Sequence, residues 1–246
     1  MLIFRRFLFF GFLVNLALPS MPAETSPPPP AIVIGFVGGF VRHDDPVRGG
    51  VKLAERLRSD YGSTSVHVEV FENHRREKAR KEILRLLHVN THRRPLTPQE
   101  KENARIIIYG ISWGGSETVA LAQELKKDGI PVTLTIQVDS VAKIGQHDDV
   151  IPANVAEAAN FYQVSGLLHG RREIRAENPA ATRIDGNFRF DYSASTLKCE
   201  GYPWHQRFLF RTHVQIECDP TVWGQVEALV RSKLPKARVG TNSTGL

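Results

Sequence analysis

The chain has 246 residues, of which 41% are hydrophobic and 24% are charged. This is the composition of a globular protein with one core, and at this length we expect no second domain. The formal net charge of +6 includes Arg5 and Arg6, and removing these two with a predicted leader leaves +4. Acidic residues are interspersed among the remaining cations, so together with an export signal we expect no nucleic-acid partner.

The first 23 residues have the features of a secretory signal peptide. Arg5 and Arg6 precede an apolar run at 7–18, which is followed by prolines and small residues. The run is shorter than the roughly 20 residues that a membrane span needs. We therefore predict cleavage and a secreted or periplasmic protein with no stable membrane span, and regard an uncleaved anchor as the alternative.

The domain boundaries follow from composition. Residues 24–30 are rich in proline and predict an extended spacer. The folded domain is expected to occupy 31–234. The last stretch, 235–246, has no apolar periodicity and is expected to be a disordered tail.

The predicted elements alternate between strands and helices along the chain. Apolar or alternating stretches predict strands at 31–37, 65–71, 105–109, 131–138 and 161–164. Helical spacing of apolar residues predicts helices at 46–59, 75–88, 115–127, 152–159 and 220–234. A hairpin is expected around 185–187. This order predicts an α/β domain whose mostly parallel sheet is flanked by helices on both faces, with the site at the carboxyl ends of the strands.

A serine stands between two glycines where the third predicted strand meets a helix. The sequence there is Gly110-Ile111-Ser112-Trp113-Gly114. In a nucleophile elbow the flanking glycines are required because a Cβ would collide with neighbouring backbone. The pattern alone is weak, but its place between a buried strand and an amphipathic helix favours Ser112 as a nucleophile.

A nucleophilic serine needs a base and an acid, expected in the chain order Ser, acid, His. Asp139 directly follows the next predicted strand and is the preferred acid. His213 lies on a predicted loop before the last helix and is the preferred base, with His205 as its rival. Three other carboxylates compete with Asp139, namely Asp148, Asp149 and Asp185.

The loop after the first strand is expected to supply an oxyanion donor. It contains Gly38-Gly39-Phe40, in which glycine lets backbone approach a substrate oxygen closely. We expect the N–H groups of Phe40 and Trp113 to form the oxyanion hole. The nearby His43-Asp44-Asp45 are adjacent loop residues, which rarely converge on one ion, so we predict no metal site.

The chain resembles the α/β-hydrolase superfamily, in particular its lipase and serine-esterase branch with a compact core. The resemblance covers roughly 31–234 and rests on four motifs: Gly38-Gly39-Phe40, Gly110-Ile111-Ser112-Trp113-Gly114-Gly115, Val138-Asp139-Ser140 and His213-Val214-Gln215-Ile216. It implies that Ser112 is the nucleophile, His213 the base and Asp139 the acid. Ile111 stands where many relatives have histidine, so the resemblance does not specify a substrate.

These features together predict an exported serine hydrolase that cleaves a carboxylic ester or thioester of a small molecule or lipid without a cofactor. The alternative is an inactive binding protein that keeps the glycines for folding alone. The two cysteines, Cys199 and Cys218, are expected to form a disulfide, as is common in exported proteins.

Overall fold

A computed structural model of the chain describes residues 30–88 and 97–237. The predicted signal peptide, most of the proline-rich spacer and most of the predicted tail lie outside these residues. No helix within the described ranges combines the length and apolar character needed to cross a bilayer.

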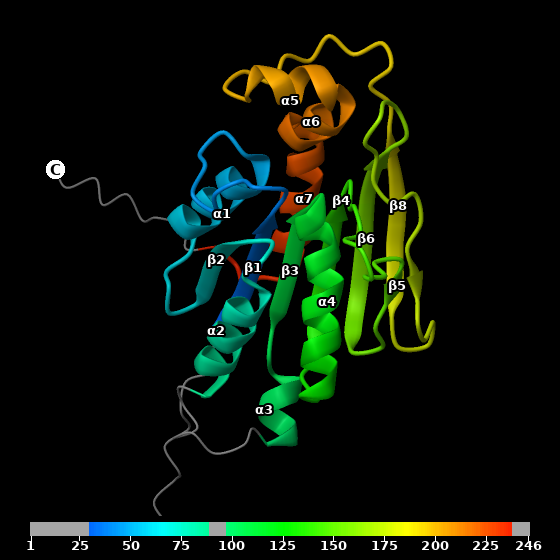
Figure 1. Ribbon diagram of the computed structural model, residues 1–246. Coiled ribbons are helices and arrows are strands. Elements are labelled where there is room, and N and C mark those ends of the chain that lie inside the picture. Colours follow the sequence, from blue (N-terminus) through cyan, green and yellow to red (C-terminus); the bar gives the residue numbers. More distant parts are fainter. Residues whose placement is uncertain (1–29, 89–96, 238–246) are drawn as a thin grey trace, which may run out of the picture.

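A parallel sheet forms the centre of the molecule (Figure 1). Its strands lie in the order β2-β1-β3-β4-β6-β8, and every neighbouring pair is parallel. Their bounds are Ala31–Val37 (β1), Val66–Glu72 (β2), Ile106–Ile111 (β3), Val132–Val138 (β4), Val155–Gln163 (β6) and Arg183–Phe190 (β8). Every residue of β1 and β3 is buried, as expected for central strands that are covered on both faces. Two short strands, β5 (Val150–Ile151) and β7 (Arg175–Ala176), pair with each other.

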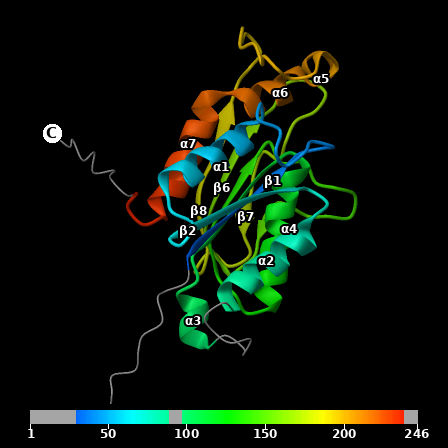
Figure 2. The same ribbon diagram turned by 90° about the vertical axis from the view of Figure 1, so that its left-hand side faces the viewer.

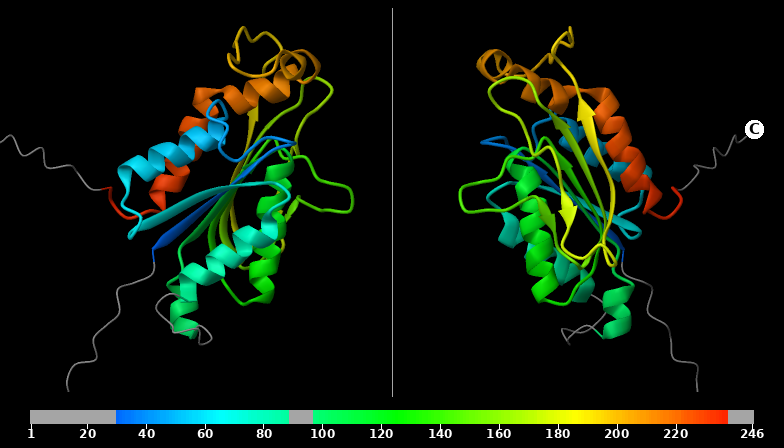
Figure 3. Two further views of the ribbon diagram at one scale, coloured as in Figure 1. Left: turned by 60° about the vertical axis from the view of Figure 1, so that its left-hand side comes forward. Right: turned by 90° about the vertical axis from the view of Figure 1, so that its right-hand side faces the viewer.

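Helices cover both faces of the sheet (Figures 2 and 3). On one face lie α1 (Gly49–Asp60), α6 (Arg211–Cys218) and α7 (Pro220–Ser232), and on the other lie α2 (Arg76–His88) and α4 (Trp113–Lys127). The short helix α3 (Pro98–Glu102) lies near the amino ends of the strands (Figure 1). Alternate residues of β1 and β3 enter separate cores, so that Ile107 packs on the first face and Ile108 on the second. The predicted fold class, a parallel sheet flanked by helices on both faces, is confirmed.

Two predicted elements are wrong. The helix expected at 152–159 is the start of β6, which pairs with β4 and β8. The hairpin expected around 185–187 is a continuous strand, β8, parallel to β6. The turn-forming residue Asn187 is used inside the strand, because its Oδ1 accepts hydrogen bonds from Asn160 Nδ2 (3.1 Å) and from the Ile174 N–H (2.8 Å).

Beyond the carboxyl ends of the strands lie α5 (Trp204–Leu209) and α6 (Figure 1). The prediction that His213 lies on a loop is also wrong, since His213 is a residue of α6. Its neighbours Val214 and Ile216 are buried, which draws the segment onto the core as a short helix. A disulfide joins Cys199 to Cys218, the last residue of α6.

Candidate active site

Ser112 occupies a strained turn between β3 and α4. Its φ of 56° and ψ of −126° lie outside the regions that non-glycine residues favour, a strain of about 1–3 kcal/mol. The turn is held by hydrogen bonds from the Ser112 N–H to Val138 O (3.0 Å) and from the Val141 N–H to Ser112 O (3.1 Å). A Cβ on Gly110 would overlap the Gly114 carbonyl, so glycine is required there.

A pocket of about 930 Å³ opens beside this turn. Its walls combine the elbow, the loop after β1 and the α5–α6 region: Gly38, Gly39, Phe40, Ser112, Trp113, Leu168, Phe210 and His213 are among its lining residues. Ser112 and His213 are therefore brought to one pocket from positions about a hundred residues apart in the chain. Both side chains are largely buried, with residue exposures of 8% and 7%.

Asp139 and His213 are joined by a buried hydrogen bond. Asp139 Oδ2 lies 2.6 Å from His213 Nδ1, and Asp139 is fully buried. A carboxylate only accepts, so the imidazole carries its proton on Nδ1 and the lone pair of Nε2 is free to accept a proton. No hydrogen bond joins the Ser112 hydroxyl to His213 in the part of the chain that the structure describes. Such bonds are often long in free enzymes and tighten only in the reacting complex.

Gln163, which was not among the predicted site residues, donates two hydrogen bonds to Asp139. Its Nε2 donates to Asp139 Oδ2 (2.9 Å), and its main-chain N–H donates to Oδ1 (3.2 Å). The Gly170 N–H also donates to Oδ1 at 2.7 Å. Asp139 itself has a positive φ of 41°. A signal existed in the sequence, because Gln163 is a polar residue at the carboxyl end of β6, the strand beside the one that leads to Asp139.

The two expected oxyanion donors lie on the same pocket. Trp113 is the first residue of α4, where a helix leaves its N–H groups without intrahelical partners. The loop before Phe40 turns through Gly39, whose φ is +48°. The Phe40 ring is 97% exposed and contacts the Trp113 ring edge to face, with centroids 5.7 Å apart.

The rival carboxylates bind other partners. Asp148 is fully buried and accepts from Ser140 Oγ (2.6 Å) and Arg171 Nε (2.9 Å). Asp149 pairs with Arg175, and Asp185 pairs with Arg183. Among the described residues, none of the three forms a hydrogen bond or ion pair with His213.

The rival base, His205, is exposed on α5 and its ring contacts Trp204, with the centroids 6.0 Å apart. His205 is not among the residues that line the Ser112 pocket. In the loop before α1, His43 Nδ1 lies 2.6 Å from Glu72 Oε1. The structure therefore groups His213, and neither of these two histidines, with Ser112.

An ion pair that the sequence did not suggest lies in the pocket wall. Arg48 is buried, and its Nη1 lies 3.1 Å from Glu217 Oε2. Arg48 also binds Asp45 (3.0 Å) and Gln206 (3.2 Å). Burial raises the pKa of Glu217, and the Arg48 guanidinium opposes that rise. The pocket thus has an aromatic rim and one wall of paired charges.

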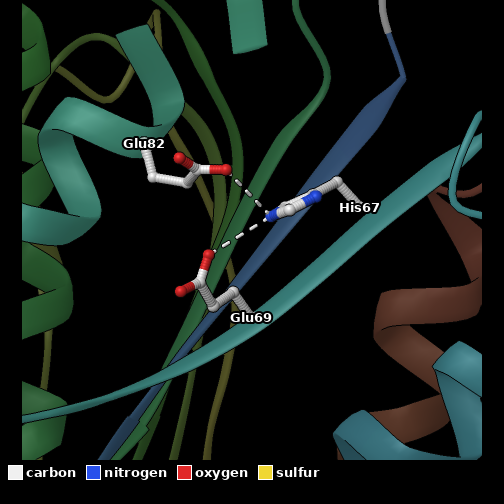
Figure 4. Close-up of side chains that lie close together, drawn as sticks. All are labelled: His67, Glu69 and Glu82. Atoms are coloured by element: carbon white, nitrogen blue, oxygen red, sulfur yellow. Dashed lines mark hydrogen bonds and ion pairs between the residues drawn. The ribbon is translucent and has the colours of Figure 1, made fainter. Parts of the chain in front are cut away.

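A second cluster of charged side chains lies on β2 and α2 (Figure 4). His67 Nε2 is 3.3 Å from Glu69 Oε2 and 3.4 Å from Glu82 Oε1, a grouping that could in principle hold a metal ion. However, Arg85 already binds both carboxylate oxygens of Glu82, and this hydrogen bonding lowers the pKa of Glu82. The cluster is an ion-pair network on a different part of the molecule from the Ser112 pocket.

No protein-family model and no curated protein matches the sequence. Similar folds occur among solved structures. An uncharacterized protein from Pseudomonas aeruginosa aligns with a TM-score of 0.48 and 11% identity over 84% of this chain and 46% of the other, so this chain spans less than half of its length. A cutinase-like protein from Cryptococcus sp. aligns with a TM-score of 0.42 and 11% identity, over 85% of this chain and 96% of the other. An acetyl xylan esterase gives a TM-score of 0.38 and 12% identity, over 84% and 99%.

At this level of similarity the matches carry no information on the substrate of this chain. The architecture that the α/β-hydrolase resemblance implies is present in the sheet order and in the strand–serine–helix turn.

Proposed function

We propose that the protein is a serine hydrolase that cleaves a carboxylic ester or thioester through an acyl-enzyme. The observation that carries the proposal is the 2.6 Å bond between the buried Asp139 and His213 in the pocket that also contains Ser112. The positive φ of Ser112, which lifts its side chain out of the strand-to-helix turn, supports the same role.

The reaction follows from these three side chains. Ser112 Oγ attacks the ester carbonyl carbon while His213 Nε2 takes the hydroxyl proton. The N–H groups of Phe40 and Trp113 stabilise the negative oxygen of the tetrahedral intermediate. The intermediate collapses to the acyl-enzyme, and the leaving alcohol or thiol takes the proton from His213. Water then repeats these steps to release the acid, while Asp139 keeps His213 in the required tautomer.

The substrate is expected to have an apolar part and a polar part. Phe40, Trp113 and Phe210 offer apolar contacts around the mouth of the pocket, whereas Arg48 and Glu217 offer polar ones. These charges are paired with each other, which favours a neutral polar group over a strongly charged one. A small-molecule or lipid ester fits this description, and none of the steps calls for a cofactor.

Labelling with a fluorophosphonate tests the proposal. The wild-type protein should be labelled, and Ser112→Ala should not. Ser116→Ala is the matched control, because Ser116 is a buried serine on α4, the helix that follows Ser112. The Ser116 hydroxyl donates to the Trp113 carbonyl at 2.9 Å. The Ser116→Ala variant should be labelled like the wild type. Hydrolysis of p-nitrophenyl esters of graded chain length would then define the acyl preference.

The second candidate is an inactive protein that binds a ligand in the same pocket. The observation that favours it is the lack of a hydrogen bond between Ser112 and His213 within the described residues. It predicts that folded wild-type protein is not labelled and hydrolyses none of the esters. That result would rule out the hydrolase.

Export of the protein remains part of the proposal. The disulfide between Cys199 and Cys218 supports an oxidising compartment, in which such bonds persist. N-terminal sequencing of the protein recovered outside the cytoplasm should start near residue 24. A protein that keeps residues 1–23 and stays with the membrane would contradict cleavage.

A further inference from the structure

A buried asparagine holds the loop that carries the proposed oxyanion donor. Asn73 follows β2 and is 4% exposed. Its side-chain nitrogen donates a hydrogen bond to the carbonyl oxygen of Gly39. A Cβ added to Gly39 would meet no atom within 4 Å, so no close packing contact surrounds that side of the residue. Within the turn formed by residues 38–41, the Val41 N–H donates a hydrogen bond to Gly38 O at 3.2 Å.

This bond determines which way the next N–H points. The described chain contains no cis peptide bond, so the carbonyl of Gly39 and the N–H of Phe40 point in opposite directions from one peptide plane. The carbonyl faces Asn73, which does not line the pocket. Gly39 and Phe40 do line it, together with Ser112. The Phe40 N–H is therefore turned away from Asn73.

Asn73 is in turn tied to the helix that follows Ser112. Lys143 Nζ donates to the main-chain oxygen of Asn73 (2.7 Å) and to Glu117 Oε1 (2.6 Å). Glu117 is a buried residue of α4 and also binds Arg76 Nη1. Glu117 therefore has two cationic partners, and only the loss of both would leave its buried charge unpaired. Lys143 thus connects Asn73 to the element that begins at the nucleophile.

We propose that Asn73 is a positioning residue that directs the Phe40 N–H into the oxyanion hole. The inference rests on the proposed hydrolase function. Asn73 does not touch substrate. It acts through the Gly39–Phe40 peptide, and without its bond that peptide is free to rotate about the flexible glycine.

The first test is Asn73→Ala. The oxyanion exists in the transition state and not in the bound ester, so a misplaced donor lowers kcat and leaves KM nearly unchanged. We expect a loss of about 10- to 100-fold in kcat, because a displaced donor contributes less than a well-placed one. Affinity for a trifluoromethyl ketone, which binds as a tetrahedral adduct, should fall by a similar factor.

The second test is Asn73→Asp, read as a pH profile. An ionised carboxylate cannot donate, and it repels the Gly39 carbonyl oxygen. A protonated carboxyl donates again. The ratio of kcat in Asn73→Asp to kcat in the wild type should therefore rise as the pH is lowered. The same ratio for Asn73→Ala should not change with pH. A role in general stability would produce no such difference between the two variants.

Asn154→Ala provides the matched control. Asn154 is another partly buried asparagine whose side chain donates to two main-chain carbonyls, Ala122 O (3.0 Å) and Ile130 O (2.9 Å), far from the pocket. It should lower the melting temperature and leave kcat unchanged.

Two results would overturn the inference while leaving the hydrolase intact. One is an Asn73→Ala variant whose kcat is within about twofold of the wild-type value, because a misplaced donor is expected to cause a much larger loss of kcat. The other is an Asn73→Asp ratio that stays flat with pH. A wild type that a fluorophosphonate does not label removes the proposed function and, with it, this inference. The pH profile of Asn73→Asp is measured on protein that its melting curve shows to be folded. This test therefore remains valid even if Asn73→Ala does not fold.

Discussion

The two halves of the candidate site are supported in different ways. In the acid–base half, Asp139 has hydrogen bonds from His213, from the Gln163 side chain and from two main-chain N–H groups. In the oxyanion half, the Gly39 carbonyl depends on one side chain, Asn73. Main-chain donors belong to the fold and are kept when a side chain is truncated to alanine. The acid–base half is therefore expected to tolerate the loss of a supporting side chain, whereas the oxyanion half is not.

The largest effect is expected when the acid itself is changed. Asp139→Asn should lower kcat about 10⁴-fold, because an amide can present its NH₂ to His213 and stabilise the wrong tautomer. Steady-state hydrolysis of one p-nitrophenyl ester measures this. Asp148→Asn is the control, since Asp148 is also a buried carboxylate but is bound to Ser140 and Arg171. If Asp148→Asn lost more activity than Asp139→Asn, the acid would be misassigned.

Removing the disulfide tests how far helix α6 depends on it. The bridge ends on the helix that carries His213. Replacing Cys199 and Cys218 together by serine should lower the free energy of unfolding by about 3 kcal/mol, measured by urea denaturation. The Asp139–His213 bond does not involve the bridge, so kcat at low temperature should stay close to that of the wild type. A loss of kcat as large as that of Asp139→Asn would mean that the hydrogen bond from His213 to Asp139 does not position His213 without the bridge.

Gln163→Ala compares directly with Asn73→Ala. It removes one donor from Asp139 but leaves those of His213, Gly170 and its own main-chain N–H. We expect a loss of kcat below about tenfold, smaller than for Asn73→Ala, because three donors still orient the carboxylate. Equal losses in the two variants would remove the contrast between the halves.

The smallest effect is expected for Phe40→Ala. The proposed donor is the main-chain N–H, and Phe40 is almost fully exposed. With a p-nitrophenyl acetate substrate, kcat should change by no more than about twofold, while KM for longer acyl chains should rise because apolar contact with the chain is lost. A collapse of kcat on the acetate would mean that the ring, through its contact with Trp113, holds the loop in place.

Local patterns in the sequence were sufficient for the centre of the fold. The strands β1 and β3 are visible as short apolar runs, and the turn at Ser112 is visible from the glycines beside it. Both features depend on residues that are neighbours in the sequence. Asp139, the first residue after β4, could be singled out as well, because the carboxyl ends of parallel strands meet at one edge of the sheet. For this reason Ser112 and Asp139 could be named as candidates before their positions were known, whereas His213 was chosen for its place before the last helix and lies in α6 instead of on the expected loop.

The edge of the sheet and the supports of the site were decided by tertiary contacts. Asn187 reads as a turn residue in sequence, yet in β8 its side chain bonds to Asn160 and Ile174. His213 lies in a helix because the core draws its neighbours inward.

The sequence alone thus determined a parallel α/β sheet with a serine at a strand-to-helix turn. Only the tertiary structure decided which side chains bind one another around the pocket that contains this serine. Asn73 and Gly39 are 34 positions apart, and Arg48 and Glu217 are 169 apart. A buried polar side chain must find a partner, but its own neighbours in sequence do not say which one, since the partner is selected by the packing of distant elements.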